Sequence, residues 1–291
     1  MLLEVVNPSP LLAQDVIEIQ SLFEYPVAPE ELPTMSEKSN YIVEHFWDKL
    51  DLKNKNTVDQ NALNHAFRVY SVAMRFADRE TTLSANQKLI NNLVKNPTLL
   101  LQFTKAAEEN IYGPRAEFWI DEVYMQFLNA LSANKKITPA RKGKYIKQLE
   151  AISNSKEGQI AKKFKFENRN GSSSSYFPMS TPTMIIFGDP WDTEWRMARL
   201  KIESNLKIIN ALDKGKINIL FILPDKKDGW EDQVNNYSPK WSVGAGENLK
   251  EIYDLRMNPS VYVIGSDGKI LIKNSNLQSS VETLLKQLKE E

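Results

Sequence analysis

Three short, continuous apolar runs in the second half of the sequence constrain the fold more than any other feature. They span residues 183–187, 217–223 and 260–264. Such runs are typical of strands buried on both faces of a sheet. A helical segment separates the first two, which favours a parallel pair with a right-handed crossover. A fourth run, 269–273, follows a tight turn and should lie antiparallel to the third. The order predicts a mixed sheet flanked by helices.

Other segments complete this α/β pattern. Phe164-Lys165-Phe166 alternates in polarity, and turn residues and four serines follow it, which predicts a hairpin at the edge of the sheet. Helices are expected at 192–213, 248–253 and 279–290, the first ending before Gly215, which is suited to a left-handed C-cap.

The first half of the chain has helical periodicity instead. Ala62, Ala66, Phe67, Tyr70 and Ala73 recur at the spacing of one helix face. Start signals such as Asn96-Pro97, and Ser84 three residues before Gln87, divide the region. The expected helices are 10–23, 38–50, 58–79, 84–95, 98–111, 115–133 and 139–152. We therefore predict an all-α domain over 1–154 and an α/β domain over 155–291.

The composition excludes several classes of function. The protein contains no cysteine, so it has no disulfide, thiolate nucleophile, iron–sulfur cluster or cysteine zinc site. Lysine plus arginine and aspartate plus glutamate both number 37, which gives no indication of nucleic-acid binding. No apolar run is long enough to span a membrane, and the first residues lack the pattern of a signal peptide.

The two histidines give no indication of a metal site. His45 and His65 are too far apart in sequence for a zinc motif. His45-Phe46-Trp47 is an unusual cluster that would suit ligand stacking, but we interpret it as a helix edge packed into the core, because aromatic side chains usually bury for their area alone.

Four segments of the second half together carry a resemblance to a known family. They are GQIAKKF at 158–164, IIFGDPW at 185–191, YDLRMNPS at 253–260 and GSDGKI at 265–270. Their order resembles the thioredoxin fold, and more narrowly the envelope thiol-disulfide oxidoreductases related to cytochrome-maturation proteins and peroxiredoxins. PEELP at 29–33 and YIVEHFW at 41–47 resemble an uncharacterised helical domain of bacterial envelope proteins. The resemblance implies a periplasmic or cell-envelope location.

The resemblance also locates the active site that this chain has lost. In the family a C-x-x-C motif follows the position of Trp191, but here Asp192, Thr193, Glu194 and Trp195 follow it. Neither Asp192 nor Trp195 can attack a disulfide, so no catalytic residue is carried over. A carboxylate can still accept the unpaired N–H groups of a helix start, and either Asp192 or Asp189 suits this role. Because capping explains these carboxylates, we expect neither a metal site nor a cofactor.

The family's binding groove is the second expectation. In family members the proline at the position of Pro259 is cis and the preceding backbone pairs with bound polypeptide, so the resemblance implies a cis Asn258–Pro259 bond. Trp191, Trp195, Asn258, Pro259 and Ser260 would then form a groove for an extended polypeptide. Core packing explains the tryptophans equally well.

Three hypotheses for function follow. The leading one is a redox-inactive thioredoxin-fold protein of the bacterial cell envelope that acts as a binding or scaffold module. The alternative is a thiol-disulfide oxidoreductase whose cysteines at positions 192 and 195 were lost or engineered away. The third is a purely structural role, in which the fold is a rigid partner for the helical domain.

Overall fold

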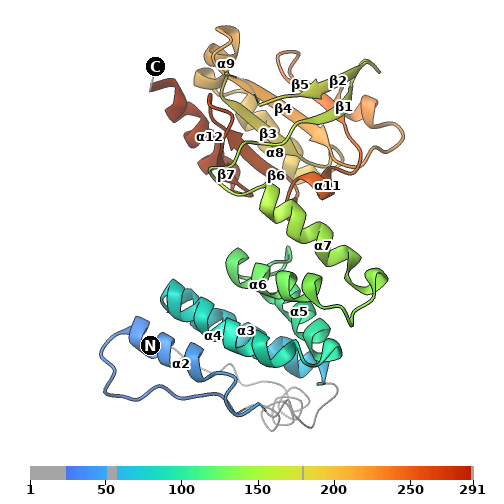
Figure 1. Cartoon of the computed structure of the whole chain (residues 1–291). Coiled ribbons are helices and arrows are strands. Elements are labelled where there is room, and N and C mark those ends of the chain that lie inside the picture. Colours follow the sequence, from blue (N-terminus) through green and yellow to red (C-terminus); the bar gives the residue numbers. More distant parts are fainter. Residues whose placement is uncertain (1–23, 51–57, 179, 290–291) are drawn as a thin grey trace, which may run out of the picture. The chain divides into compact units, whose positions relative to one another are not determined.

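The computed structural model describes residues 24–50, 58–178 and 180–289 (Figure 1). The expected helix at 10–23 lies outside this part. Contacts divide the chain into two compact units, Met1–Ile146 and Lys147–Glu291. In the described part, no helix combines the length and apolar character needed to cross a membrane.

The first unit is built from helices. Helix α3 packs against α2 and α5, while α6 packs against α4 and α5. Their bounds are α2 Met35–His45, α3 Gln60–Phe76, α4 Arg79–Leu93, α5 Pro97–Ile111, α6 Asp121–Ala133 and α7 Pro139–Asn154, the last of which continues into the second unit. The all-α prediction for this region is confirmed.

Two helix starts differ from the prediction more than the others. Helix α4 begins at Arg79 rather than residue 84, and its buried stripe already starts at Thr82. The preceding Asp78 bonds Ser36 and Asn40 of α2, which anchors the start of α4 to its neighbour. Helix α6 begins at Asp121 rather than residue 115. Residues 113–120 form a loop instead, closed by hydrogen bonds from the Trp119 indole N–H to the Gly113 carbonyl and from the Ile120 N–H to the Ile111 carbonyl.

Aromatic side chains form the centre of this unit. Phe46 is buried, and the Trp47 ring lies 5.4 Å from the rings of Phe67, Tyr70 and Phe103. The His45 side chain is exposed and its Nδ1 lies 2.7 Å from an Asp48 carboxylate oxygen. The interpretation of the cluster as a helix edge packed into the core is therefore confirmed.

The second unit contains a seven-stranded mixed sheet in the order β2-β1-β5-β4-β3-β6-β7. Strands β3, β4 and β5 are parallel, whereas β6 runs antiparallel to β3 and β7. The bounds are β1 Phe164–Asn168, β2 Ser173–Tyr176, β3 Thr183–Phe187, β4 Asn218–Leu223, β5 Ser242–Ala245, β6 Ser260–Ile264 and β7 Ile270–Lys273. The predicted hairpin and the four predicted strands are present.

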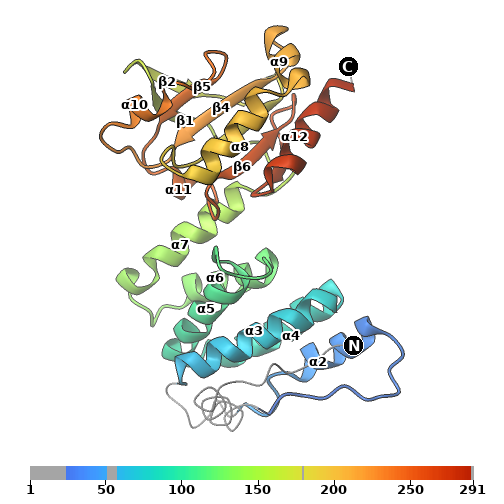
Figure 2. The same cartoon turned by 180° about the vertical axis from the view of Figure 1, so that it is seen from behind.

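Helices cover the sheet because its strands are apolar on both faces. Met184 and Ile186 of β3 pack on one face with α8, α9, α10 and α12, and Ile185 and Phe187 pack on the other with α11 and the aromatic residues of the hairpin. Figure 2 shows α8 and α12 lying across one face of the sheet. The helices are α8 Thr193–Glu203, α9 Leu206–Asp213, α10 Trp230–Val234, α11 Leu249–Ile252 and α12 Leu277–Lys286, followed by a 3₁₀ turn at Gln287–Lys289. A mixed sheet flanked by helices is confirmed.

The sequence did not predict the short helix α10 or two further features of this unit. The expected single helix at 192–213 is two helices, because the chain leaves the helix at Ser204 and Asn205 caps α9 by accepting from the N–H groups of Lys207 and Ile208. Strand β5 was missed, since four residues show no clear periodicity. Gly244 of β5 lies so close to β1 that an added Cβ would be 2.4 Å from the Glu167 carbonyl oxygen.

Candidate functional site

The start of helix α8 stands where the family has its two cysteines. Asp192 is the N-cap, and its carboxylate accepts a hydrogen bond from the Trp195 N–H over 2.7 Å. Thr193 and Glu194 are exposed in the first turn. Of the two capping alternatives, Asp192 is therefore the residue that caps the helix, which satisfies a main-chain donor that would otherwise face the site.

The Trp195 side chain points into the core. It is 1% exposed, and its indole N–H donates to the Tyr237 hydroxyl over 2.8 Å. Its ring stacks on Phe221 of β4, with centroids 5.2 Å apart and planes 8° apart. Position 195, where the resemblance places the second cysteine, is thus occupied by a packed core residue.

Asp189 organises the loop between β3 and α8. Its carboxylate accepts from the Trp191 N–H over 3.0 Å and lies 2.8 Å from the Lys227 ammonium. Burial alone would raise the pKa of Asp189, but the hydrogen bonds from Lys227 and Trp191 lower it below its ordinary value. Lys227 also lies 5.2 Å from the centre of the Trp191 ring, at cation–π distance.

Asn258 connects this loop to the segment before β6. Its side-chain oxygen accepts from the Asp189 N–H over 2.9 Å, and its amide donates to Asp192 over 3.3 Å. The Asn258–Pro259 peptide bond is cis. A Cβ added to Gly188 would lie 3.2 Å from Pro259, so the proline packs directly against the end of β3.

A buried charge cluster supports the segment that leads to Asn258. Asp254 is buried, accepts a hydrogen bond from the Arg256 guanidinium over 2.9 Å, and lies 2.9 Å from the Lys273 ammonium. The Asp254 carbonyl accepts from the Tyr262 hydroxyl and the Asn274 amide. These contacts fix Asp254 against β6 and the end of β7, four residues before Asn258.

The residues expected to form the groove fall into two groups. Asn258 is exposed and Trp191 and Pro259 are half-buried, so these three offer surface. Trp195 and Ser260 are buried, and the Ser260 hydroxyl bonds the N–H and the carbonyl of Met257. The side chains of Trp195 and Ser260 therefore offer no surface to a ligand.

Sequence reasoning missed two residues of this surface. Met257 is 42% exposed beside Asn258, and Lys227 follows the carboxyl end of β4. Because the carboxyl ends of neighbouring parallel strands meet at one edge of a sheet, a lysine shortly after β4 could have been placed near the end of β3 from the sequence pattern. Nothing in the local sequence marks Met257.

The chemistry open to this site is binding rather than thiol exchange. The chain has no cysteine, and the carboxylates of Asp189 and Asp192 are occupied by main-chain N–H groups and by Lys227 or Asn258. Within residues 24–50, 58–178 and 180–289, no group of histidine and carboxylate side chains is arranged to hold a metal ion.

Comparisons with known proteins bear on both the helical half and the α/β half of the chain. Residues 9–155 match a protein family described as Domain of unknown function (DUF5106). A solved thioredoxin-like protein from Bacteroides caccae is 19% identical, with a TM-score of 0.71 over 91% of this chain and 98% of that one. The thioredoxin domain of a thiol-disulfide oxidoreductase from Bacteroides vulgatus is 17% identical and covers 45% of this chain and 96% of that one, with a TM-score of 0.38. No curated protein matches.

The likeness to the Bacteroides caccae protein extends over both units and shows that the fold is thioredoxin-like. The sequence-based expectation of a thioredoxin-like domain after an uncharacterised helical domain is confirmed.

Proposed function

Because the chain belongs to the DUF5106 family and joins that domain to a thioredoxin-like fold without cysteine, we propose that it is a redox-inactive binding or scaffold module of the bacterial cell envelope. Its ligand is an extended polypeptide that lies across Trp191, Met257, Asn258 and Pro259. We propose that the helical domain comprises residues 1–154, up to the end of α7, and the thioredoxin-like domain residues 155–291.

The single observation that carries this proposal is that Asn258 is exposed and has main-chain groups without a hydrogen-bond partner among the described residues. Its side chain is bonded to the loop after β3, and the residue itself is exposed. In the described part of the chain, no group bonds the main-chain N–H or carbonyl of Asn258. Main-chain groups without an internal partner on an exposed residue can pair with an added strand, which is how proteins bind extended peptides without chemistry.

The neighbouring side chains suit the same ligand. Trp191 is half-buried at cation–π distance from Lys227, and Met257, which directly precedes Asn258, is 42% exposed, so both present some apolar surface. Main-chain pairing supplies affinity, and apolar side chains of this kind supply preference for particular residues of the ligand.

Residue-specific photo-crosslinking in the producing bacterium tests the proposal. A photoreactive residue at position 257 should capture a discrete polypeptide, and the same residue at position 206, which is 72% exposed on α9, should not. The captured polypeptide should then bind the purified protein, and binding should weaken when Trp191 is replaced by alanine. Equal capture from both positions, or none from 257, would favour the purely structural role.

The oxidoreductase alternative has a separate test. The structure offers no observation in its favour, since Asp192 caps α8 and Trp195 fills the core. Cysteine codons at positions 192 and 195 in the native gene would revive it. Cell fractionation tests the envelope location: recovery of the protein in the cytosolic fraction would contradict it.

A further inference from the structure

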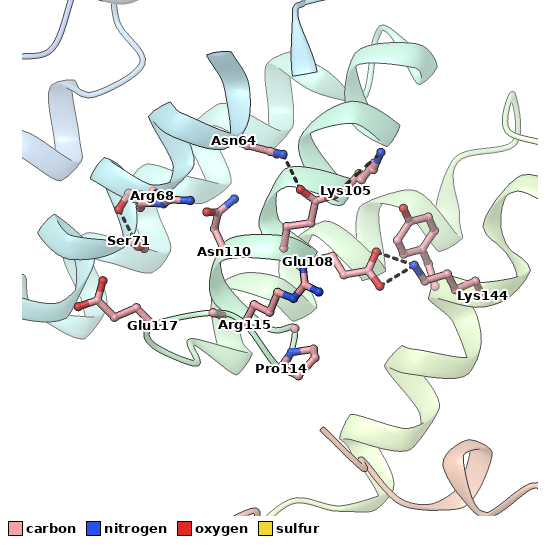
Figure 3. Close-up of a pocket in the computed structure, with 14 residues that line it drawn as sticks. Asn64, Arg68, Ser71, Lys105, Glu108, Asn110, Pro114, Arg115, Glu117 and Lys144 are labelled. Atoms are coloured by element: carbon pink, nitrogen blue, oxygen red, sulfur yellow. Dashed lines mark hydrogen bonds and ion pairs between the residues drawn. The ribbon is translucent and has the colours of Figure 1, made fainter. Parts of the chain in front are cut away.

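The helical unit contains a polar pocket that the proposed function does not use (Figure 3). Its volume is about 810 Å³, and it is lined by residues of α3, α5, the loop after α5 and α7, all between residues 64 and 145. Pockets of about 300–1,000 Å³ commonly hold small molecules. The size of this pocket is therefore that of a binding site.

Two arginines come to the pocket from different elements. Figure 3 shows Arg68 on α3 and Arg115 on the loop after α5. Within the described ranges, neither guanidinium group has an ion-pair or hydrogen-bond partner. Lys144 differs, because its ammonium lies 2.6 Å from Glu108. A guanidinium group presents a planar fork of donors that matches a carboxylate or a phosphate. The pocket thus has two cations available for an oxyanion.

Hydrogen-bonding groups line another part of the pocket. Glu108 is held by Lys144, and Glu109 accepts from the Asn64 amide. The Tyr145 residue is buried, and no described residue bonds its hydroxyl. Burial and the neighbouring glutamates raise the pKa of Tyr145 to about 12, so this hydroxyl keeps its proton at neutral pH. Carboxylates accept from hydroxyl groups, and a phenol both donates and accepts.

Apolar side chains contribute little to the lining. Pro114 and Ala116 are the aliphatic residues of the loop, and the remainder are charged or polar apart from Gly113 and Tyr145. The position of this loop depends on Gly113, because an added Cβ would lie 3.0 Å from the Glu108 carbonyl oxygen. The carbon atoms of the charged and polar side chains also line the pocket, so a ligand that combines hydroxyl groups with carbon–hydrogen faces, as a sugar ring does, finds partners for both.

We propose that this pocket binds a small anionic sugar, with its oxyanion between Arg68 and Arg115 and its hydroxyl groups on Glu108, Glu109 and Tyr145. The carboxylate of a sugar acid and the phosphate of a sugar phosphate offer the same chemistry to the two guanidinium groups. The proposal concerns the helical unit alone and does not depend on the groove at Asn258.

Isothermal titration calorimetry on the full chain tests the proposal with D-glucuronate, D-glucose 6-phosphate, D-glucose and inorganic phosphate. One of the two anionic sugars should bind with one-to-one stoichiometry. The sugar that binds shows whether the pocket takes a carboxylate or a phosphate. Glucose lacks the charge and inorganic phosphate lacks the hydroxyl-bearing body, so each should bind at least about tenfold more weakly. Raising the salt concentration should weaken binding, because the arginines are exposed.

Variants identify the residues involved. Arg68→Ala and Arg115→Ala should each weaken binding by about tenfold or more, because each removes a charge-assisted contact. Arg141→Ala is the matched control: it removes the same charge from an exposed site on α7 outside the pocket, and it should leave affinity unchanged. Tyr145→Phe should weaken binding several-fold while preserving the ring.

Several outcomes would overturn the proposal. The first is that neither anionic sugar gives a heat of binding at about 10 mM, and the second is that glucose binds as tightly as the anionic sugars. The third is that Arg68→Ala and Arg141→Ala lose the same amount of affinity. Inorganic phosphate that binds as tightly as the sugars would show a simple anion site. Because Arg68 and Arg115 are exposed, their variants are expected to fold, and circular dichroism verifies this.

Discussion

Replacing Trp195 with alanine should destabilise the thioredoxin-like domain by about 3–5 kcal/mol. The side chain is 1% exposed, stacks on Phe221 and donates a hydrogen bond to the Tyr237 hydroxyl. The change removes a large buried surface and leaves a cavity, because a packed core relaxes only in part. A residue that served mainly to contact a ligand would show a much smaller loss.

Phenylalanine at position 195 separates packing from hydrogen bonding. Trp195→Phe retains most of the ring stacking but loses the bond to Tyr237, so it should cost about 1–3 kcal/mol. Tyr237→Phe removes the same bond from the other side and leaves the indole N–H buried. The double variant should therefore cost less than the sum of the two, by about 0.5–1.5 kcal/mol.

Hydrogen exchange of the full chain is the appropriate assay. The chain has two compact units, so one denaturation curve need not describe a single transition. The slowest amides of β3 and β4 report the opening of the sheet that Trp195 packs against. Trp191→Ala, at a half-buried site four residues earlier, is the control and should cost less. A loss below about 1 kcal/mol for Trp195→Ala would refute the reasoning. So would a double variant of Trp195→Phe and Tyr237→Phe that loses as much stability as the two single variants together.

Three further changes follow from individual contacts. Asp254→Asn removes the buried carboxylate that Arg256 and Lys273 contact and should cost about 3–5 kcal/mol by the same exchange assay. Burial alone would raise the pKa of Asp254, but Arg256 and Lys273 lower it below its ordinary value. The carboxylate therefore contributes stability above about pH 4, and this contribution should be lost as the pH falls further. In urea titrations at decreasing pH, Asp254→Asn should lose less stability than the unchanged protein, because it lacks this carboxylate. Asp192→Ala removes the cap of α8 and should cost about 0.5–2 kcal/mol, with faster exchange in its first turn, whereas asparagine retains most of the cap. Gly188→Ala places a Cβ 3.1 Å from the nearest side-chain atom and should lower the stability measured by hydrogen exchange in β3 and β4 by about 1–3 kcal/mol.

Local signals were sufficient for many elements of the fold. The strands at 183–187 and 260–264 lie where the apolar runs predict them, because a strand buried on both faces needs a continuous apolar run. The start of α5 at Pro97 follows Asn96, since an N-cap and a first-turn proline act through adjacent atoms.

Elements that depend on distant partners were not predictable in the same way. Strand β5 is short and is positioned by its pairing with β1 and β4, which come from segments far away in the sequence. The break between α8 and α9 depends on whether Asn205 caps a helix or continues one, and its residue type permits both.

Apolar periodicity in the sequence predicted a helical domain followed by a mixed sheet flanked by helices, and the resemblance of four segments indicated the thioredoxin-like fold. The absence of cysteine excluded thiol exchange, because composition is a property of the chain itself. Only the tertiary structure decided that Trp195 belongs to the core while Asn258 is exposed, and that Arg68 and Arg115 share one pocket. The direction of a side chain depends on neighbours that folding brings from elsewhere in the sequence, such as Phe221 and Tyr237 for Trp195.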